Sequence, residues 1–138
     1  MDCVCYKNFK NECFVKTFLF KNYSKINAHD IKILADINSR VEWVIENNGT
    51  EREGLFEYLP PYKFAELKIR DKNNWIRILC FFDKEKNRFV LLSAYYKPYR
   101  YKDGEVKKIN KMIEEENLKA DLYQSDYLNN KEKRYEKY

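Results

Sequence analysis

The chain has 138 residues and a formal net charge of +5, with 44% hydrophobic, 17% aromatic and 36% charged residues. This composition excludes a disordered chain, and the length fits one domain with one core. No apolar segment approaches the length of a membrane span, and the apolar run at residues 14–20 is too short for a secretory signal. We therefore expect a cytoplasmic protein with no membrane partner, in which the four cysteines stay reduced.

The positive charge is concentrated in one block of the chain. Residues 61–112 contain 14 basic and 6 acidic side chains, a net charge of +8, whereas residues 1–60 and 113–138 have net charges of −1 and −2. A basic block of this kind is typical of proteins that bind nucleic acid or another polyanion. The alternative interpretation is a lysine-rich surface that only interacts with water.

The first part of the chain predicts one strand and two helices. Alternating apolar side chains indicate a strand at residues 13–20. Asn27 is a suitable N-cap for a helix that has apolar residues at helical spacing and ends near Gly49. The pattern Thr50-x-x-Glu53 is typical of a capping box, and it predicts a second, short helix to about residue 59.

The second part predicts a sheet followed by a helix. Strands at residues 64–71, 75–82 and 88–96 are separated by short turns, so we expect an antiparallel meander. A helix follows at residues 105–118. The predicted fold class is α+β: the first strand and the meander form an antiparallel sheet that packs against the N-terminal helices, with a C-terminal helix. A single domain at residues 1–122 would then precede a polar C-terminal tail at residues 123–138, either helical or disordered.

The first two strands of the meander give the main functional signal. Successive strand side chains point to opposite faces, and a two- or four-residue turn places Lys68, Arg70 and Arg77 together on one face. Like charges across a strand pair repel, so this cluster predicts an anionic partner. Glu66 shares the face. A cross-strand ion pair with Arg77 is the favoured interpretation, and a proton acceptor is the alternative.

Basic and aromatic residues near the end of the third strand extend this face. Lys97 ends the strand, Tyr99, Arg100 and Tyr101 follow in a loop, and Trp75 has the parity of the cationic face. Guanidinium groups bind phosphates and aromatic rings stack on unpaired bases, so the combination suits RNA. The alternative is an ordinary surface on which lysine and tyrosine side chains lie with their polar ends in water.

The sequence predicts no metal site and no cofactor. Its one histidine, His29, lies in the first turn of a predicted helix, and the cysteines lack the spacing of a zinc site. We interpret His29 and Trp43 as structural residues. Neither a glycine-rich phosphate loop nor a Ser/His/Asp arrangement is present.

Three segments of the chain resemble, in this order, strands of the RelE/HigB superfamily of bacterial toxins, including its phage-derived relatives. They are residues 66–70, 75–82 and 89–97. Members of that superfamily carry a Glu-Leu-Arg-x-Arg strand, a Tyr-Arg-x-x-Tyr-Phe strand, a Val-Leu-Leu-His-x-Phe-x-Lys-Lys strand and a C-terminal helix. The resemblance covers about residues 60–115. It implies a RelE-like fold, and the predicted element order agrees with that fold over nearly the whole chain.

The resemblance also implies an activity, namely that of a type II toxin that cleaves mRNA on the ribosome. The family's basic residues, which hold the scissile phosphate and assist proton transfer, correspond here to Lys68, Arg70, Arg77 and Lys97. Lys68, crowded by cations, is the candidate base or proton relay. The family's terminal aromatic residue corresponds to Tyr99 or Tyr101. The implied partners are a cognate antitoxin, expected to be a helix-turn-helix protein, the ribosome and mRNA.

The chain departs from the family pattern at several positions. Trp75-Ile76 precedes Arg77 where tyrosine is usual, Ser93 stands in place of the family histidine, and Pro98 replaces the second lysine. Two other functions therefore stay open. One is a ParE-like poison of DNA gyrase, which shares the fold, and the other is a non-enzymatic, phage-derived module that binds RNA or protein.

Overall fold

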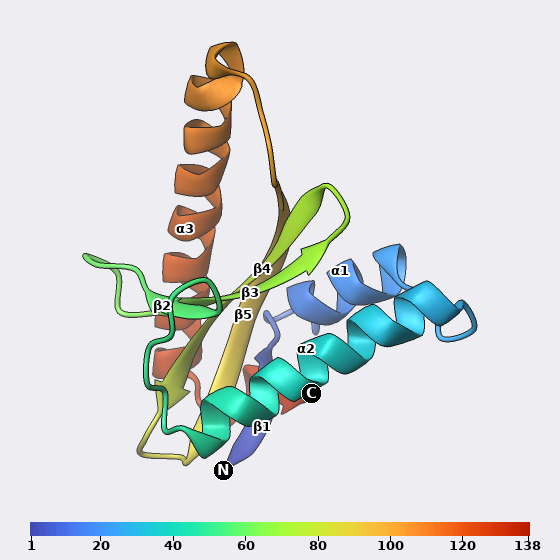
Figure 1. Cartoon of the computed structure of the whole chain (residues 1–138). Coiled ribbons are helices and arrows are strands. Elements are labelled where there is room, and N and C mark those ends of the chain that lie inside the picture. Colours follow the sequence, from blue (N-terminus) through green and yellow to red (C-terminus); the bar gives the residue numbers. More distant parts are fainter.

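A mixed six-stranded sheet forms the centre of the structure, a computed structural model that describes residues 1–138 (Figure 1). The strand order is β2-β3-β4-β5-β1-β6, with β1 parallel to β5 and the other neighbours antiparallel. The fold class is α+β, as predicted, but the predicted all-antiparallel sheet was wrong, because the added strand β1 runs parallel to β5. The elements in chain order are β1 (Asp2–Tyr6), α1 (Phe14–Asn22), α2 (Ala28–Glu46), β2 (Phe56–Tyr58), β3 (Ala65–Asp71), β4 (Asn74–Asp83), β5 (Arg88–Pro98), the 3-10 helix η1 (Asp103–Glu105), α3 (Val106–Asn129) and β6 (Tyr135–Lys137).

The predicted meander is confirmed in the strands β3, β4 and β5. Asp71 lies opposite Asn74, so the β3–β4 turn has two residues, and Lys72 adopts a φ of 53° there. This register fixes which side chains share a face. The pairing of β4 with β5 shifts between Leu79 and Cys80, which is the signature of a β-bulge.

The helix predicted from Asn27 is confirmed as α2. The Asn27 side chain accepts hydrogen bonds from the backbone N–H groups of His29 and Asp30, as an N-cap should. The buried stripe of α2 packs with α1 on one face of the sheet, against residues such as Leu67 and Ile78 (Figure 1). Its members are Ile33, Ile37, Val41 and Val44.

The strand predicted at residues 13–20 was wrong, because most of that segment forms α1. Val15 and Leu19, four residues apart, are the buried positions of this helix. In a segment this short, the same apolar residues also match an alternating pattern, so periodicity alone does not distinguish a helix from a strand. The strand that joins the meander is instead β1, in a part of the chain for which the sequence predicted no element.

The short helix predicted at residues 50–59 was also wrong. Gly54 has a φ of 76°, which no residue of a right-handed helix adopts, and Arg52 bridges to Phe56. The chain then continues as the edge strand β2, whose Glu57 lies opposite Glu66 of β3. Tertiary pairing with β3 has overridden the capping pattern.

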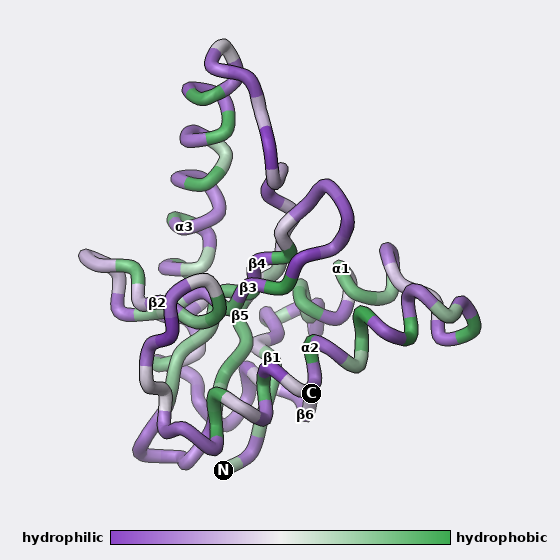
Figure 2. The backbone as a smooth tube through the Cα atoms, in the orientation of Figure 1, coloured by the Kyte–Doolittle hydropathy of each residue, from purple (hydrophilic) through white to green (hydrophobic).

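The C-terminal helix is longer than the predicted segment at residues 105–118, since α3 continues to Asn129. Ala120, Gln124 and Tyr127 continue its buried stripe. The predicted tail at residues 123–138 thus supplies the last turns of α3 and the edge strand β6. The more apolar stretches gather in the sheet, whereas the β3–β4 turn and the segment before α3 are hydrophilic (Figure 2).

Helix α3 packs on the sheet face opposite to α1 and α2. It contacts that face through Ala120 and Tyr127, next to Leu79, Phe81 and Tyr95. The sequence predicted that the helices pack on one face of the sheet and that the cations lie on the opposite face. That expectation was wrong for part of the face, because the positions that follow the cations along the strands are apolar and bind α3.

Candidate nucleic-acid interface

The predicted cationic face exists, and its side chains form two rows across β3, β4 and β5. Lys68, Arg77 and Tyr95 lie directly opposite one another and form what we name the inner row. Arg70, Trp75 and Lys97 form the outer row, one step nearer the β3–β4 turn. Residues directly opposite each other share a face of an antiparallel sheet. The four predicted catalytic residues and Trp75 therefore lie on the same face.

The inner row is neutralised by carboxylates. Lys68 Nζ lies 3.0 Å from Glu57 Oε1 and 3.6 Å from Glu66 Oε1, and Arg77 Nη1 lies 3.3 Å from Glu66 Oε2. The Lys68 and Arg77 side chains are only 15% and 12% exposed. The cross-strand ion pair predicted between Glu66 and Arg77 is thus present. Two cations face two carboxylates, so this row attracts a polyanion weakly.

Burial of the inner row leaves polar atoms without partners inside the protein. Glu66 is 3% exposed, and its Oε2 atom accepts no hydrogen bond, although it lies near Arg77. Arg77 Nε also lacks a hydrogen-bond acceptor, and the Arg77 guanidinium reaches the Tyr95 hydroxyl at 3.5 Å. Burial raises the pKa of the Tyr95 hydroxyl above its usual value, and the nearby guanidinium opposes that effect.

The outer row remains open. None of the ion pairs of the chain involves Arg70, Lys97 or Arg100. The Arg70 guanidinium carbon lies 3.4 Å from the centre of the Tyr99 ring, and the ring of Trp75 lies 5.6 Å from that of Tyr99. Such cation–π and aromatic contacts stabilise this arrangement of the side chains.

A cavity of about 270 Å³ opens beside this row. It is lined by Arg70, Asn73, Tyr99 and Arg100, and the Tyr99 backbone N–H donates a hydrogen bond to the Asn73 carbonyl. Two guanidinium groups, an amide and an aromatic ring thus surround one space. This donor set matches a phosphate group with an adjacent base.

Lys97 has an electrostatic environment unlike that of a surface lysine. Partial burial lowers its pKa, and the positive charges of Arg77 and Lys68 lower it further, while Glu66 acts in the opposite sense. The Lys97 ammonium also lies 5.7 Å from the centre of the Tyr101 ring. A lysine with a lowered pKa gives up its proton more readily than others, which suits proton transfer.

We expect Lys97 to be acylated at a lower pH than a solvated lysine, because only the unprotonated amine reacts. The measurement is pulse labelling with an amine-acylating reagent between about pH 8 and pH 11, with peptide mass spectrometry. The pH midpoint of labelling is compared with that of exposed Lys107. Burial also slows the reaction of the Lys97 amine with the reagent, so the pH midpoint of labelling is compared and not the labelling rate. A midpoint for Lys97 equal to or above that of Lys107 contradicts the lowered pKa.

Sequence reasoning missed two groups that shape this interface. Glu57, the partner of Lys68, was assigned to a helix, so its place opposite Glu66 was hidden. A hydrogen bond from the Gly54 N–H, followed by the contact with Lys68, lowers the pKa of Glu57. Asn73, in the turn, joins the cavity because the β3–β4 turn bends toward Tyr99.

No cluster of three or more His, Cys, Asp or Glu side chains is arranged to hold a metal ion. No helix combines the length and the apolar character needed to cross a membrane. Comparison of the sequence with protein-family models and with curated proteins gives no match.

Proposed function

We propose that this chain is a toxin with a RelE-like fold that cleaves mRNA on the ribosome, and that the outer row binds the mRNA. The observation that carries the proposal is the outer row itself. Arg70 and Lys97 project from β3 and β5 without a carboxylate partner, beside Arg100 and Tyr99 of the next loop. Unpaired cations interleaved with aromatic rings suit single-stranded RNA.

In this proposal the reaction is attack of an RNA 2′-hydroxyl on the adjacent phosphorus. The new bond closes a 2′,3′-cyclic phosphate, and the bond from phosphorus to the 5′-oxygen breaks. Lys97 in its neutral form accepts the proton of the 2′-hydroxyl, and Arg70 or Arg100 binds the phosphorane oxygens. The 5′-oxygen takes a proton from water. The sequence placed the base on Lys68, whereas contact with two carboxylates makes Lys68 a positioning residue here.

The inner row lies next to the outer row on the same face and affects it electrostatically. Glu66 holds Arg77 and Lys68 in place, and the charges of these two cations lower the Lys97 pKa. Such a small catalytic set needs an external scaffold to orient the substrate, which is the role that the proposal gives to the ribosome. A cognate antitoxin is the expected inhibitor, since a cover over the outer row blocks access of mRNA.

A second candidate is a module that binds RNA without cleaving it. The burial and pairing of Lys68 and Arg77 favour this alternative, because two of the four predicted catalytic cations are largely buried and already paired with carboxylates. The two candidates share the RNA-binding surface. They differ only in whether a phosphodiester bond breaks.

The test combines RNA binding with cleavage on ribosomes. In an Arg70→Ala/Lys97→Ala variant we expect the slope of log Kobs against log salt to fall by about 1.4 for single-stranded RNA, which is 0.7 for each lost phosphate contact. Cleavage, measured by mapping mRNA 5′ ends after incubation with translating ribosomes, should disappear. The matched control is Lys21→Ala/Lys32→Ala, which removes the same charge from exposed positions on α1 and α2.

The outcomes separate the candidates. Cleavage by the unmodified chain that is lost in the outer-row variant and kept in the control supports the endonuclease. Salt-sensitive binding with no cleavage on translating ribosomes supports the binding module. Equal binding by the outer-row variant and the unmodified chain rejects both.

A further inference from the structure

The strand β4 is longer than its neighbour β3, which leaves one end of β4 with a free edge. β4 pairs with β5 down to Asp83, whereas β3 begins at Ala65, opposite Cys80. Residues Phe81, Phe82 and Asp83 therefore have a strand on one side only. Unpaired N–H and C=O groups along such an edge are a template for an added strand.

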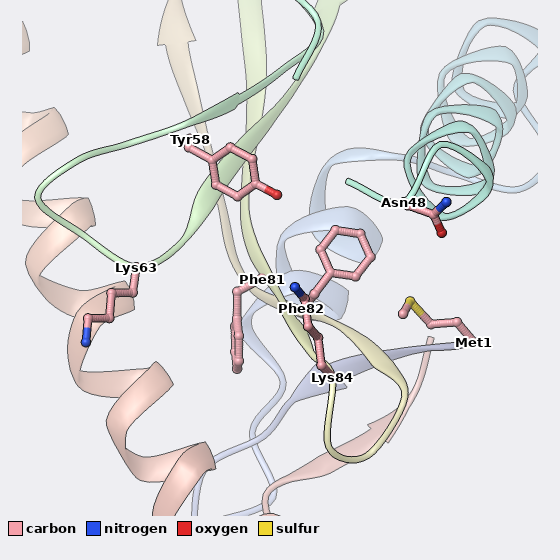
Figure 3. Close-up of a pocket in the computed structure, with 7 residues that line it drawn as sticks. All are labelled: Met1, Asn48, Tyr58, Lys63, Phe81, Phe82 and Lys84. Carbon is pink, nitrogen blue, oxygen red and sulfur yellow. The ribbon is translucent and has the colours of Figure 1, made fainter. Parts of the chain in front are cut away.

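A hollow of about 480 Å³ lies at this free edge. Phe81 and Phe82 are in its wall, with Tyr58 of β2 above them and the side chain of Met1 on the far side (Figure 3). Phe81 and Phe82 are consecutive strand residues, so they point to opposite faces of the sheet. The hollow thus extends around the edge of β4, in the space that an extension of β3 would occupy.

Three aromatic side chains in the wall of the hollow are held by contacts within the protein. The Tyr58 hydroxyl donates a hydrogen bond to the Gly49 carbonyl at 2.8 Å, which fixes the ring. The Phe82 ring stacks on Phe89, with ring centres 4.7 Å apart. Phe81 is 7% exposed and packs against Tyr127 of α3. A segment that enters the hollow meets preformed aromatic surfaces, which lowers the entropy lost on binding.

The charged side chains that line the hollow are all positive. Lys63 and Lys84 lie at its rim, neither forms an ion pair, and no carboxylate lines the hollow (Figure 3). The nearby Asp83 does not compensate them, because its carboxylate is buried and accepts hydrogen bonds from Tyr127 and Lys131. The complementary ligand therefore has an apolar body and negative charge at its sides.

We propose that the free edge of β4 binds an extended segment of a partner protein in which apolar and acidic residues alternate. Its main chain pairs with residues Phe81–Asp83, its apolar side chains lie on the face of the sheet that carries Phe82 and Tyr58, and its carboxylates reach Lys63 and Lys84 at the rim. This mode gives affinity through main-chain hydrogen bonds and specificity through alternate side chains. The proposal is independent of the RNA function, since none of these residues belongs to the outer row.

The test uses a short fluorescein-labelled peptide of alternating Glu and Val residues, with fluorescence anisotropy as the readout. We expect binding that weakens by about tenfold or more in a Lys63→Glu/Lys84→Glu variant. The matched control, Lys107→Glu/Lys111→Glu, makes the same charge change at exposed positions on α3 and should leave binding unchanged. In amide NMR spectra, the peptide should shift the resonances of Phe81, Phe82 and Asp83.

Four results would overturn the proposal. The first is the absence of saturable binding of the peptide, and the second is equal binding by the Lys63→Glu/Lys84→Glu variant. The third is equal binding of a peptide with Lys in place of Glu, which points to non-specific adhesion. The fourth is self-association of the chain, seen by sedimentation and abolished by Lys63→Glu/Lys84→Glu, which identifies a second copy of this chain as the occupant.

Discussion

Replacing Arg77 with Ala should destabilise the protein by about 3–5 kcal/mol, because the change leaves the buried Glu66 carboxylate without its guanidinium. Glu66 is 3% exposed, and its Oε2 atom lies 3.3 Å from Arg77 Nη1. Lys68, at 3.6 Å from the other carboxylate oxygen, is shared with Glu57 and compensates only in part. The measurement is the free energy of unfolding in urea, followed by circular dichroism.

A double-mutant cycle provides the control for this prediction. Glu66→Gln removes the charge that Arg77→Ala would expose, so the double variant should lose less stability than the sum of the two single variants. A free energy of unfolding for Arg77→Ala within about 1 kcal/mol of the unmodified chain would mean that water compensates Glu66. Because a stability loss is expected, absence of mRNA cleavage in Arg77→Ala does not define a catalytic role, and the outer-row variant is the better test.

Replacing Gly49 with Ala should cost about 2–4 kcal/mol of stability, for two reasons that add. Gly49 follows the C-terminal end of α2 with a φ of 70°, and its N–H donates a hydrogen bond to the Val44 carbonyl. A Cβ atom at this position would lie 2.6 Å from Phe82 Cε2 and 3.0 Å from the Tyr58 hydroxyl. Both rings are fixed by their own contacts, so neither yields easily.

Replacing Gly54 with Ala is the matched control, because this variant has the backbone strain expected for Gly49→Ala but not its steric crowding. Its φ of 76° is nearly that of Gly49, but a Cβ atom there would meet nothing within 4 Å. We therefore expect Gly54→Ala to cost only about 1 kcal/mol, the part due to the left-handed backbone. Thermal unfolding of the two variants side by side measures the difference. Equal losses would mean that Phe82 moves aside without cost.

The central part of the fold could be predicted because its signals are local. Two charged turns separate three alternating strands, and parity then fixes the register of Lys68 against Arg77. The positions of α1, β1 and β2 could not be predicted in the same way. The local patterns of α1 and β2 each fit two structures, and the segment of β1 predicts no element, so long-range pairing with β3, β5 or α2 determines their structure.

The candidate site also has one feature that the sequence predicts and one that it does not. Placement of Lys68, Arg70, Arg77 and Lys97 on one face follows from strand parity alone. Strand parity does not determine which of these cations is free of a carboxylate partner. That depends on Glu57 from a separate strand and on the packing of α3 against the same face. The pattern of charges along the chain thus identified the face, and only three-dimensional packing divided it into a neutral and a cationic half.

The position of β1 in the sheet has a consequence for biosynthesis. β1 lies between β5 and β6, which begin at Arg88 and Tyr135, so the strand made first has both of its neighbours far downstream. During translation β1 leaves the exit tunnel with neither edge satisfied, and its pairing waits until most of the polypeptide has been synthesised. Closing such distant contacts slows folding, and the sheet of the nascent protein is complete only after β6 has left the exit tunnel.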